Sequence, residues 1–179
     1  FCENHYSIVT PQGELLDSVK LHPFRFGGEA EHFQGGDSLA VCDYGGFTIG
    51  VQICYDLRFP EPFQILSKKA DFILVPANWP GARSGHWKCL LKARAIENMV
   101  YVAGINCAGE IGDLFYSGDS RICAPDGKKM KKETFCLPGR CPEEQIQVYE
   151  LQNDVHRYRT CFPVKEDRRE ALYQRLQEE

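Results

Sequence analysis

The sequence predicts an α/β fold in a single domain, because strand-like and helix-like segments alternate along its centre. The apolar, β-branched run 47–53 predicts a buried strand, and 60–68 predicts a short amphipathic helix. The strand 71–76, the helix 87–98 and the strand 100–106 continue the alternation. With 179 residues, of which 43% are hydrophobic, the chain is long enough to enclose one core.

Strand pairs are predicted on both sides of this centre. Residues 6–21 are expected to form a hairpin around Pro11-Gln12-Gly13. Residues 38–42 are expected to pair with the strand 47–53. Further along the chain, Pro125-Asp126-Gly127 predicts the turn of another hairpin.

The C-terminal part is predicted to be less regular. We expect a loop over 135–142, a final strand over 145–151 and a charged helical end over 170–179. There are no repeats or interdomain linkers, so we take 1–179 as one domain in which 152–179 is a C-terminal tail.

The overall composition excludes several classes of protein. The net charge is −4, so the chain lacks the basic surface that nucleic acids require. No apolar run approaches the ~20 residues that a membrane-spanning helix needs. The nine cysteines include no Cys-x-x-Cys pair, which argues against a zinc ribbon or a thiol–disulfide enzyme. Because several cysteines lie in apolar, strand-like runs, we expect reduced thiols and a cytoplasmic protein.

Cys54 ends the predicted strand 47–53 and stands at a tight turn into the helix that begins at Pro60. Proline suits a first helical turn, because its missing N–H would have had no partner there. Such a turn exposes a side chain and supplies backbone N–H donors for an oxyanion, and a helix N-terminus lowers the pKa of a thiol. These features make Cys54 a candidate nucleophile, but the local pattern alone favours the alternative of a small buried hydrophobic residue, which is what most free cysteines are.

The segment Cys54-Tyr55-Asp56-Leu57-Arg58-Phe59-Pro60-Glu61 resembles the cysteine motif of the nitrilase superfamily, the carbon–nitrogen hydrolases. Several separated motifs extend the resemblance over nearly the whole chain. It implies an αββα sandwich, in which two β-sheets pack together with helices outside, and a Glu-Lys-Cys triad that hydrolyses non-peptide C–N bonds. It also implies a small amide substrate, a homodimer or larger homo-oligomer, and no cofactor or metal.

Lys20 lies in Ser18-Val19-Lys20-Leu21-His22-Pro23-Phe24, which resembles the segment that carries the family's catalytic lysine. A cation beside the reacting carbonyl would stabilise the developing oxyanion and the thiolate. In the glycine-rich stretch 27–37, Glu29 best fits the family's second glutamate, with Glu31 as the second choice. The resemblance gives Glu29 the role of orienting Lys20, whereas composition alone would favour a solvated lysine and a flexible acidic loop.

Ala77-Asn78-Trp79-Pro80 follows a predicted strand, at the end where α/β sheets place their ligands. In the family the equivalent segment lines the pocket, so we expect Asn78 and Trp79 to bind substrate; a packing role is the alternative for Trp79. The motifs look most similar to the omega-amidase branch, whose members act on monoamides of dicarboxylic acids. A substrate carboxylate would require an arginine clamp, for which Arg83 is the first candidate and Arg58 the second.

The helix 87–98 is expected to bury one apolar face and to turn its basic residues away from the core. The apolar residues are Trp87, Leu90, Leu91 and Ala95, and the basic ones are Lys88, Lys92 and Arg94. Arg94 opens a segment, 94–98, that resembles a family signature. A buried contact with Glu97 and a solvated helix face remain alternatives for it.

The resemblance implies a two-step reaction. Cys54 attacks an amide carbonyl, Lys20 and the backbone N–H of Tyr55 hold the oxyanion, ammonia leaves, and water releases the acid from the thioester. A general base must deprotonate the thiol and then the water. The family takes this glutamate from a strand end before the lysine, but neither Glu3 nor Glu14 lies in that motif.

Two departures from the family pattern set further expectations. Cys107 follows Asn106, where the omega-amidase branch has an arginine, which weakens any specific substrate assignment. Because the base glutamate is not found, we expect that sequence before Phe1 is missing, that this polypeptide alone is inactive or poorly folded, and that a longer parent is active. The alternative is a non-catalytic nitrilase-fold scaffold or binding protein.

Overall fold

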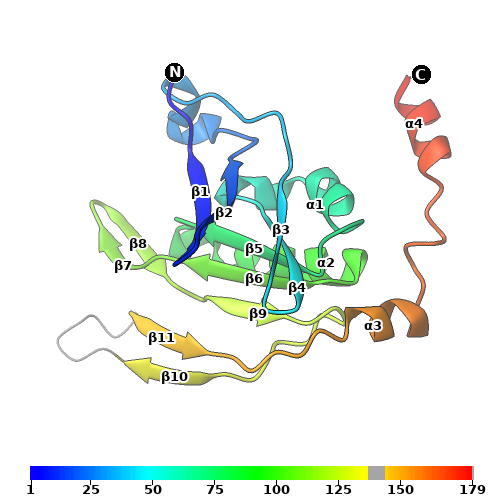
Figure 1. Ribbon diagram of the computed structural model, residues 1–179. Helices are drawn as coiled ribbons and strands as arrows, with labels where there is room; N and C mark the ends of the chain where they lie inside the picture. The colour runs from blue at the N-terminus through cyan, green and yellow to red at the C-terminus, as the bar shows by residue number, and fades with distance from the viewer. Residues whose placement is uncertain (137–143, 179) are drawn as a thin grey trace.

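A central sheet organises the fold, which the computed structural model describes for residues 1–136 and 144–178 (Figure 1). Its strands, in order across the sheet, are β3 (Val41–Tyr44), β4 (Phe47–Val51), β5 (Phe72–Ala77), β6 (Tyr101–Asn106) and β9 (Arg121–Cys123). β4, β5 and β6 run parallel, while β3 and β9 run antiparallel to their neighbours at the two edges. The carboxyl ends of the three parallel strands therefore lie side by side.

Two helices, α1 (Pro60–Leu66) and α2 (Ser84–Asn98), cover one face of this sheet (Figure 1). Their apolar side chains pack against β5 and β6, and a large fully buried one such as Phe63 or Leu91 contributes about 1.5–3 kcal/mol relative to exposure. Gly104 in β6 lets α2 approach closely, because a Cβ atom there would lie 2.4 Å from Leu91 and 2.5 Å from Trp87.

A hairpin of β1 (His5–Thr10) and β2 (Gly13–Val19) covers the other face (Figure 1). Along β5, Ile73 and Val75 belong to the core shared with the helices, while Leu74 packs in the cluster that includes Leu16 of β2. This alternation is the two-residue period of a strand that is buried on both faces. The molecule therefore has three layers at its centre: helices, central sheet and hairpin.

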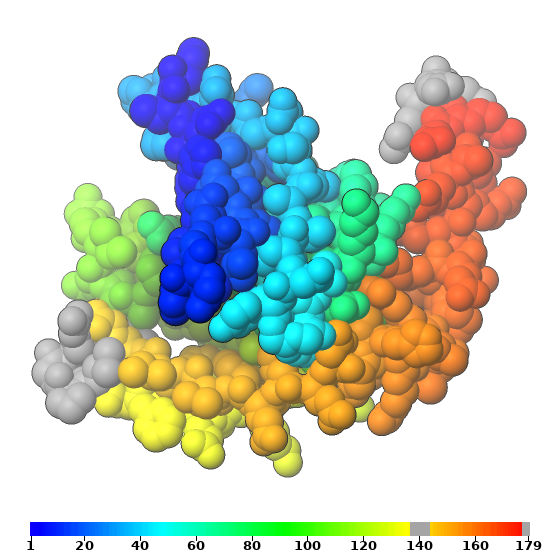
Figure 2. Space-filling model, in the orientation of Figure 1, coloured from blue at the N-terminus to red at the C-terminus, as the bar shows by residue number. Residues whose placement is uncertain are grey.

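The remaining elements lie around this centre, and Figure 2 shows the C-terminal segment projecting from the body of the molecule. The strands are β7 (Ala108–Ile111), β8 (Leu114–Ser117), β10 (Glu133–Cys136) and β11 (Gln145–Val148), and the helices are α3 (Val155–Cys161) and α4 (Glu170–Glu178). Short 3-10 helices cover Arg25–Gly27, Glu29–Glu31, Cys54–Arg58 and Gly81–Arg83. Within the described ranges, none of the helices has the length and apolar character that crossing a bilayer demands.

The predicted α/β fold and its central alternation of strands and helices are confirmed, whereas several local predictions are wrong. The final strand predicted over 145–151 ends at Val148, the last residue of β11. Residues 38–40 are not in a strand, because β3 begins at Val41. The loop predicted from residue 135 is wrong for Phe135 and Cys136, which lie in β10 and pair with β11. The rest of that predicted loop, including Cys141, falls outside the described residues.

Arg94 corrects the prediction that the basic residues of α2 face away from the core. Its side chain is buried, and its Nε and Nη2 atoms donate to the carbonyl oxygen of Leu57 at 3.1 and 2.9 Å. Nη1 pairs with Glu97 at 2.9 Å, so the buried contact is the alternative that the structure shows. The guanidinium supplies the donors that this buried carbonyl requires.

Candidate active site

The turn after β4 places Cys54 in an unusual backbone conformation. Its φ is +50°, in the left-handed region that residues with a Cβ atom rarely adopt. A 3-10 helix, Cys54–Arg58, starts at this residue and leads directly into α1, which has Pro60 as its first residue. The strand-to-helix turn predicted from the sequence is therefore present, and the Sγ atom lies 3.9 Å from the carbonyl oxygen of Asn78.

Lys20 follows β2 and is only 4% exposed, so it is not a solvated surface lysine. Its Nζ atom donates to Glu29, which also accepts from the backbone N–H of Phe24 at 2.7 Å and from Nδ2 of Asn4 at 3.2 Å. Glu31, the second choice for this position, is exposed. The chain thus brings the predicted lysine together with the first of the two candidate glutamates.

These contacts keep the Glu29 carboxylate ionised. Burial opposes its charge, but the hydrogen bonds from Lys20, Phe24 and Asn4 outweigh it and hold the pKa of Glu29 below its ordinary value. A carboxylate with three donors is a weak proton acceptor. Glu29 is therefore better suited to fixing an ammonium group than to serving as a base.

The expectation of a lowered thiol pKa is wrong for Cys54. Burial raises the pKa of its thiol above the ordinary value, and the nearby charge of Lys20 acts in the opposite direction without reversing the shift. The 3-10 helix at Cys54 has only five residues, so its dipole is small. Cys54 is therefore a protonated thiol at neutral pH and needs a base to become a nucleophile.

Cys54 lines an open hollow of about 610 Å³. The hollow is formed by the start of β1, the 3-10 helix that begins at Glu29, and the carboxyl ends of β5 and β6. Its lining residues are Asn4, His5, Tyr6, Phe24, Glu29, Ile53, Cys54, Pro76, Ala77, Asn78, Ile105, Asn106 and Cys107. Glu29 is the one carboxylate among these residues, whereas Glu3 hydrogen-bonds to His5 and Gln34 at the surface.

A smaller hollow of about 40 Å³, which is also lined by Cys54, is bordered by both candidate arginines, Arg58 and Arg83. The Arg58 guanidinium lies 4.7 Å from the centroid of the Trp79 ring, and that of Arg83 lies 5.9 Å from the Phe24 ring. Neither arginine has an ion pair with a carboxylate in the parts of the chain that the structure describes. Both guanidinium groups can therefore bind an anion.

Trp79 is 4% exposed and forms part of the wall of this smaller hollow. Its indole Nε1 donates to the carbonyl oxygen of Arg83 at 2.9 Å, which fixes the ring. Asn78 contacts the thiol through its backbone carbonyl. The ring of Tyr55 packs against that of Phe24, with 4.8 Å between the ring centroids.

Asn106 is a residue at the site that the sequence did not single out. Its Oδ1 accepts from the backbone N–H of Trp79 at 2.7 Å, and its Nδ2 donates to the carbonyl oxygens of Trp79 and Gly118, both at 2.9 Å. These bonds fix the segment that carries Asn78 and Trp79. The signal was available, because Asn106 ends a parallel strand beside β5, the position that had already drawn attention to Asn78.

Comparisons with known proteins agree with this geometry. The carbon-nitrogen hydrolase family model matches residues 4–158. Omega-amidase YafV of Escherichia coli K12 is 42% identical over 165 residues, which cover 92% of this chain and 62% of that protein. This chain therefore spans less than two thirds of the length of that relative.

Solved structures show the same fold. XC1258 from Xanthomonas campestris, a CN-hydrolase superfamily protein with an arsenic adduct in its active site, has a TM-score of 0.73 and 30% identity, over 93% of this chain and 68% of that one. A glutamate-to-glutamine mutant of the Nesterenkonia sp. AN1 amidase has a TM-score of 0.74 and 26% identity, over 91% of this chain and 57% of that one. It carries the acetamide moiety of fluoroacetamide on its active-site cysteine. With the buried Lys20–Glu29 pair beside a cysteine at a strand-to-helix turn, these matches show that the chain belongs to the carbon–nitrogen hydrolase family.

Proposed function

We propose that Cys54 is the nucleophile in the hydrolysis of a small amide to a carboxylic acid and ammonia. The observation that carries this proposal is that one hollow is lined both by a thiol on a strained turn and by Glu29, the carboxylate that holds the buried ammonium group of Lys20. The similarity to an omega-amidase, and to an amidase that is alkylated at its active-site cysteine, supports it.

In the proposed first step, the Cys54 sulfur forms a bond to the amide carbon, and the carbonyl oxygen takes up the electron pair of the C=O bond. Lys20 and the backbone N–H of Tyr55 stabilise this oxyanion. Collapse breaks the C–N bond, the nitrogen leaves as ammonia with the proton taken from the thiol, and a thioester remains. Water then attacks the thioester and restores the thiol.

The base that accepts the thiol proton is a separate question. Glu29 is committed to Lys20, Phe24 and Asn4, so we assign it to orienting Lys20. Within residues 1–136 and 144–178, no second carboxylate lines the hollow at Cys54. A test of the proposal should therefore detect the reactive thiol directly and should not depend on turnover.

Fluoroacetamide provides such a test, because ordinary thiols displace its fluoride slowly whereas an amide-binding site would orient it for attack. We expect saturable labelling of the protein with one acetamide group, mapped by peptide mass spectrometry to Cys54. Cys54→Ala should abolish this labelling. Cys107→Ala is the matched control, because Cys107 lines the same hollow, and it should leave labelling unchanged. Labelling that persists in Cys54→Ala would refute the proposal.

We further propose that the substrate carries a carboxylate at the end remote from the amide, bound by Arg83 with help from Arg58. Both guanidinium groups lie in the small hollow beside Cys54. Succinamate should protect Cys54 from fluoroacetamide at a lower concentration than propionamide does. Arg83→Gln should weaken protection by succinamate roughly tenfold, the worth of a charged hydrogen bond, and should leave protection by propionamide unchanged. Equal protection by both amides would contradict the clamp.

A non-catalytic binding protein of the same fold is the competing proposal, and the unassigned base favours it. The buried position of Lys20 argues against it, because burying an ammonium group has a cost that a binding scaffold would not require. Saturable labelling of Cys54 would decide for the enzyme.

Assembly and location are also proposals. We expect a homodimer or larger homo-oligomer in the cytoplasm. Light scattering measures the oligomeric state. The redox state of the cysteines in intact cells tests the cytoplasmic location, where we expect them to be reduced.

A further inference from the structure

Asp56 lies two residues after Cys54 and is almost completely buried, with 1% of its surface exposed. Its Oδ2 atom accepts from the backbone N–H groups of Ile53, at 3.0 Å, and Leu21, at 3.2 Å. Its Oδ1 atom accepts from the backbone N–H and from the Nδ1 atom of His22, both at 2.8 Å. All four contacts require an acceptor, and a carboxylate supplies two oxygens that only accept.

The donors come from two different layers of the molecule. Ile53 precedes the nucleophile turn at the end of β4, whereas Leu21 and His22 come directly after Lys20 at the end of β2. The hairpin β1–β2 and the central sheet are separate sheets. One buried carboxylate therefore joins the backbone next to Cys54 to the backbone next to Lys20.

We propose that Asp56 is a positioning residue that fixes the distance and direction between the Lys20 ammonium group and the Cys54 thiol. This inference rests on the proposed function, in which Lys20 acts on the oxyanion formed at Cys54. Asp56 does not line the hollow, so it acts through the two segments that it joins.

A purely local role would not account for the pattern. To stabilise the start of the 3-10 helix Cys54–Arg58, Asp56 needs only the bond to the N–H of Ile53. The other three bonds cross to the lysine segment. An asparagine would lose the bonds at one of the two oxygen positions, because its amide nitrogen would face N–H donors there.

The functional consequence follows from the distance dependence of electrostatics. Lys20 opposes the effect of burial on the Cys54 thiol, and this influence weakens as the two groups separate. Loss of the Asp56 link should therefore make the reactivity of Cys54 less sensitive to Lys20. A residue that serves stability alone would not change that sensitivity.

A double-mutant cycle on the full chain tests the proposal. The reaction rate of Cys54 with fluoroacetamide is measured against pH, with Lys20→Met made in the wild-type and in the Asp56→Asn backgrounds. We expect Lys20→Met to slow labelling at pH 8 roughly tenfold in the wild type and less than about threefold in Asp56→Asn. Asp43→Asn is the matched control, because Asp43 is an exposed carboxylate bonded to Thr48 on β4, and the Lys20 effect should persist there.

A second variant keeps the test decisive if Asp56→Asn does not fold. His22→Phe removes the side-chain bond to Asp56, one of the four bonds. It keeps an aromatic ring at the position where the His22 ring stacks on Phe59, with 3.8 Å between the ring centroids. It should reduce the Lys20 effect measurably, by about twofold. An unchanged Lys20 effect in a folded Asp56→Asn protein, or in His22→Phe if Asp56→Asn does not fold, would overturn the positioning role. Failure of Cys54 to react in the wild type would instead overturn the proposed function.

Discussion

Cys54 and Asp119 share a backbone conformation but use their side chains in opposite ways. Both are non-glycine residues with positive φ, +50° at Cys54 and +58° at Asp119. Such a conformation costs roughly 1–2 kcal/mol for an ordinary residue, although aspartate tolerates it better than most. Both residues also follow strands closely, since Cys54 comes after β4 and Asp119 lies between β8 and β9.

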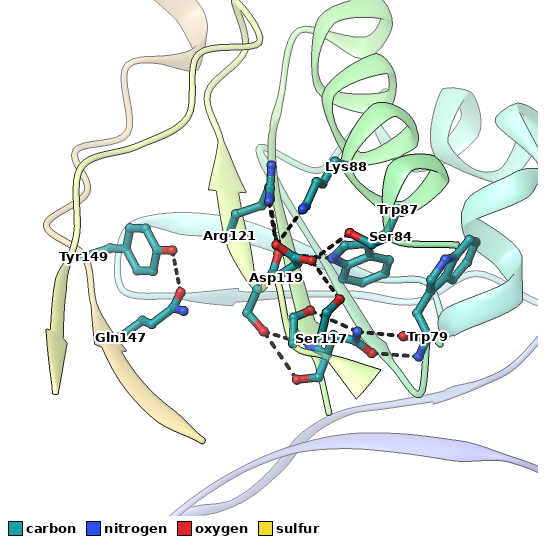
Figure 3. A network of polar contacts seen from close by, with 12 residues as sticks. Trp79, Ser84, Trp87, Lys88, Ser117, Asp119, Arg121, Gln147 and Tyr149 are labelled. Atoms are coloured by element: carbon teal, nitrogen blue, oxygen red, sulfur yellow. Dashed lines mark hydrogen bonds and ion pairs between the residues drawn. The ribbon is translucent and has the colours of Figure 1, made fainter. Parts of the chain in front are cut away.

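At Asp119 the side chain is fully engaged. Figure 3 shows the carboxylate between two hydroxyl groups, those of Ser84 and Ser117 at 2.7 Å each, and the ammonium group of Lys88 at 2.8 Å. Its backbone carbonyl also accepts from Nε1 of Trp87 at 3.2 Å. Burial opposes the charge, but these hydrogen bonds and Lys88 hold the pKa of Asp119 below its ordinary value. These contacts offset the backbone strain at Asp119, so this residue stabilises the fold.

At Cys54 the side chain packs against apolar neighbours and is almost unengaged in hydrogen bonds. Its Sγ atom contacts the carbonyl oxygen of Asn78 at 3.9 Å, a weak sulfur contact, and the thiol lines both hollows. No side-chain hydrogen bond of ordinary strength offsets the strain there, within the residues that the structure describes. Strain that is not offset locally is typical of positions kept for chemistry.

The largest expected contrast is in reactivity. Cys54→Ala should reduce acyl transfer from an activated ester by about 10³-fold or more, since the nucleophile itself is lost. Asp119→Ala should leave the same rate within about twofold, because Asp119 does not line the hollow at Cys54. Stopped-flow measurement of the released alcohol gives both rates. Similar losses in the two variants would remove the distinction between the two turns.

For the free energy of unfolding, the order of the two variants should be reversed. Asp119→Ala should lower the free energy of unfolding by about 2–3 kcal/mol, because it leaves Lys88 and two hydroxyl groups without their acceptor. Cys54→Ala should lower it by less than about 1 kcal/mol, because alanine removes only the sulfur atom and its weak contact with Asn78. Urea unfolding followed by circular dichroism measures both values, and a larger loss for Cys54→Ala would be the contrary result.

The pH dependence sharpens the role of Asp119. Its folded pKa is below its unfolded value, so its contribution to stability is fully present above the unfolded pKa of ~3.9 and is lost as pH falls through the folded pKa. The stability difference between wild type and Asp119→Asn should therefore be constant near neutral pH and shrink below about pH 4. A difference that grows on acidification would have the wrong sign.

The smallest expected effect on stability comes from the backbone strain at Cys54 and Asp119. Cys54→Gly should be more stable than Cys54→Ala by about 0.5 kcal/mol, because glycine adopts positive φ without strain while losing more entropy on folding. Asp119→Gly should remain less stable than wild type by about 2 kcal/mol, since its lost contacts exceed the strain that is relieved. Thermal unfolding of the three variants ranks them, and a Cys54→Gly protein less stable than Cys54→Ala would show that the Cys54 conformation is not strained.

The sequence predicted what depends on local pattern and missed what depends on packing. The strands and helices of the centre, the turn at Cys54 and the hairpin before Lys20 follow from periodicity and turn residues. Arg94 was misplaced because the helical period identifies a face but not the Leu57 carbonyl that lies against it. The direction of the thiol pKa shift at Cys54 was wrong for a related reason, because burial is a property of the whole fold.

The candidate site shows the same division. Motifs identified Lys20 and Glu29, and the structure places them in contact, but their catalytic roles remain proposals. Asn106 was missed although it ends a predicted strand, because strand position alone does not show its bonds to Trp79, which depend on the register between β5 and β6. Asp56 stood inside the cysteine motif without a role, because its partners at Leu21 and His22 become neighbours only when the two sheets pack.

The most direct test of Cys54 as the nucleophile is to acylate the protein with p-nitrophenyl acetate, quench with acid and map the acyl group by peptide mass spectrometry. An activated ester needs no protonation of its leaving group, so the measurement isolates the nucleophile. We predict one acetyl group on Cys54, removable by hydroxylamine as a thioester. Acetyl groups on the exposed Cys2, Cys89, Cys136 or Cys161, with Cys54 unmodified, would contradict this prediction.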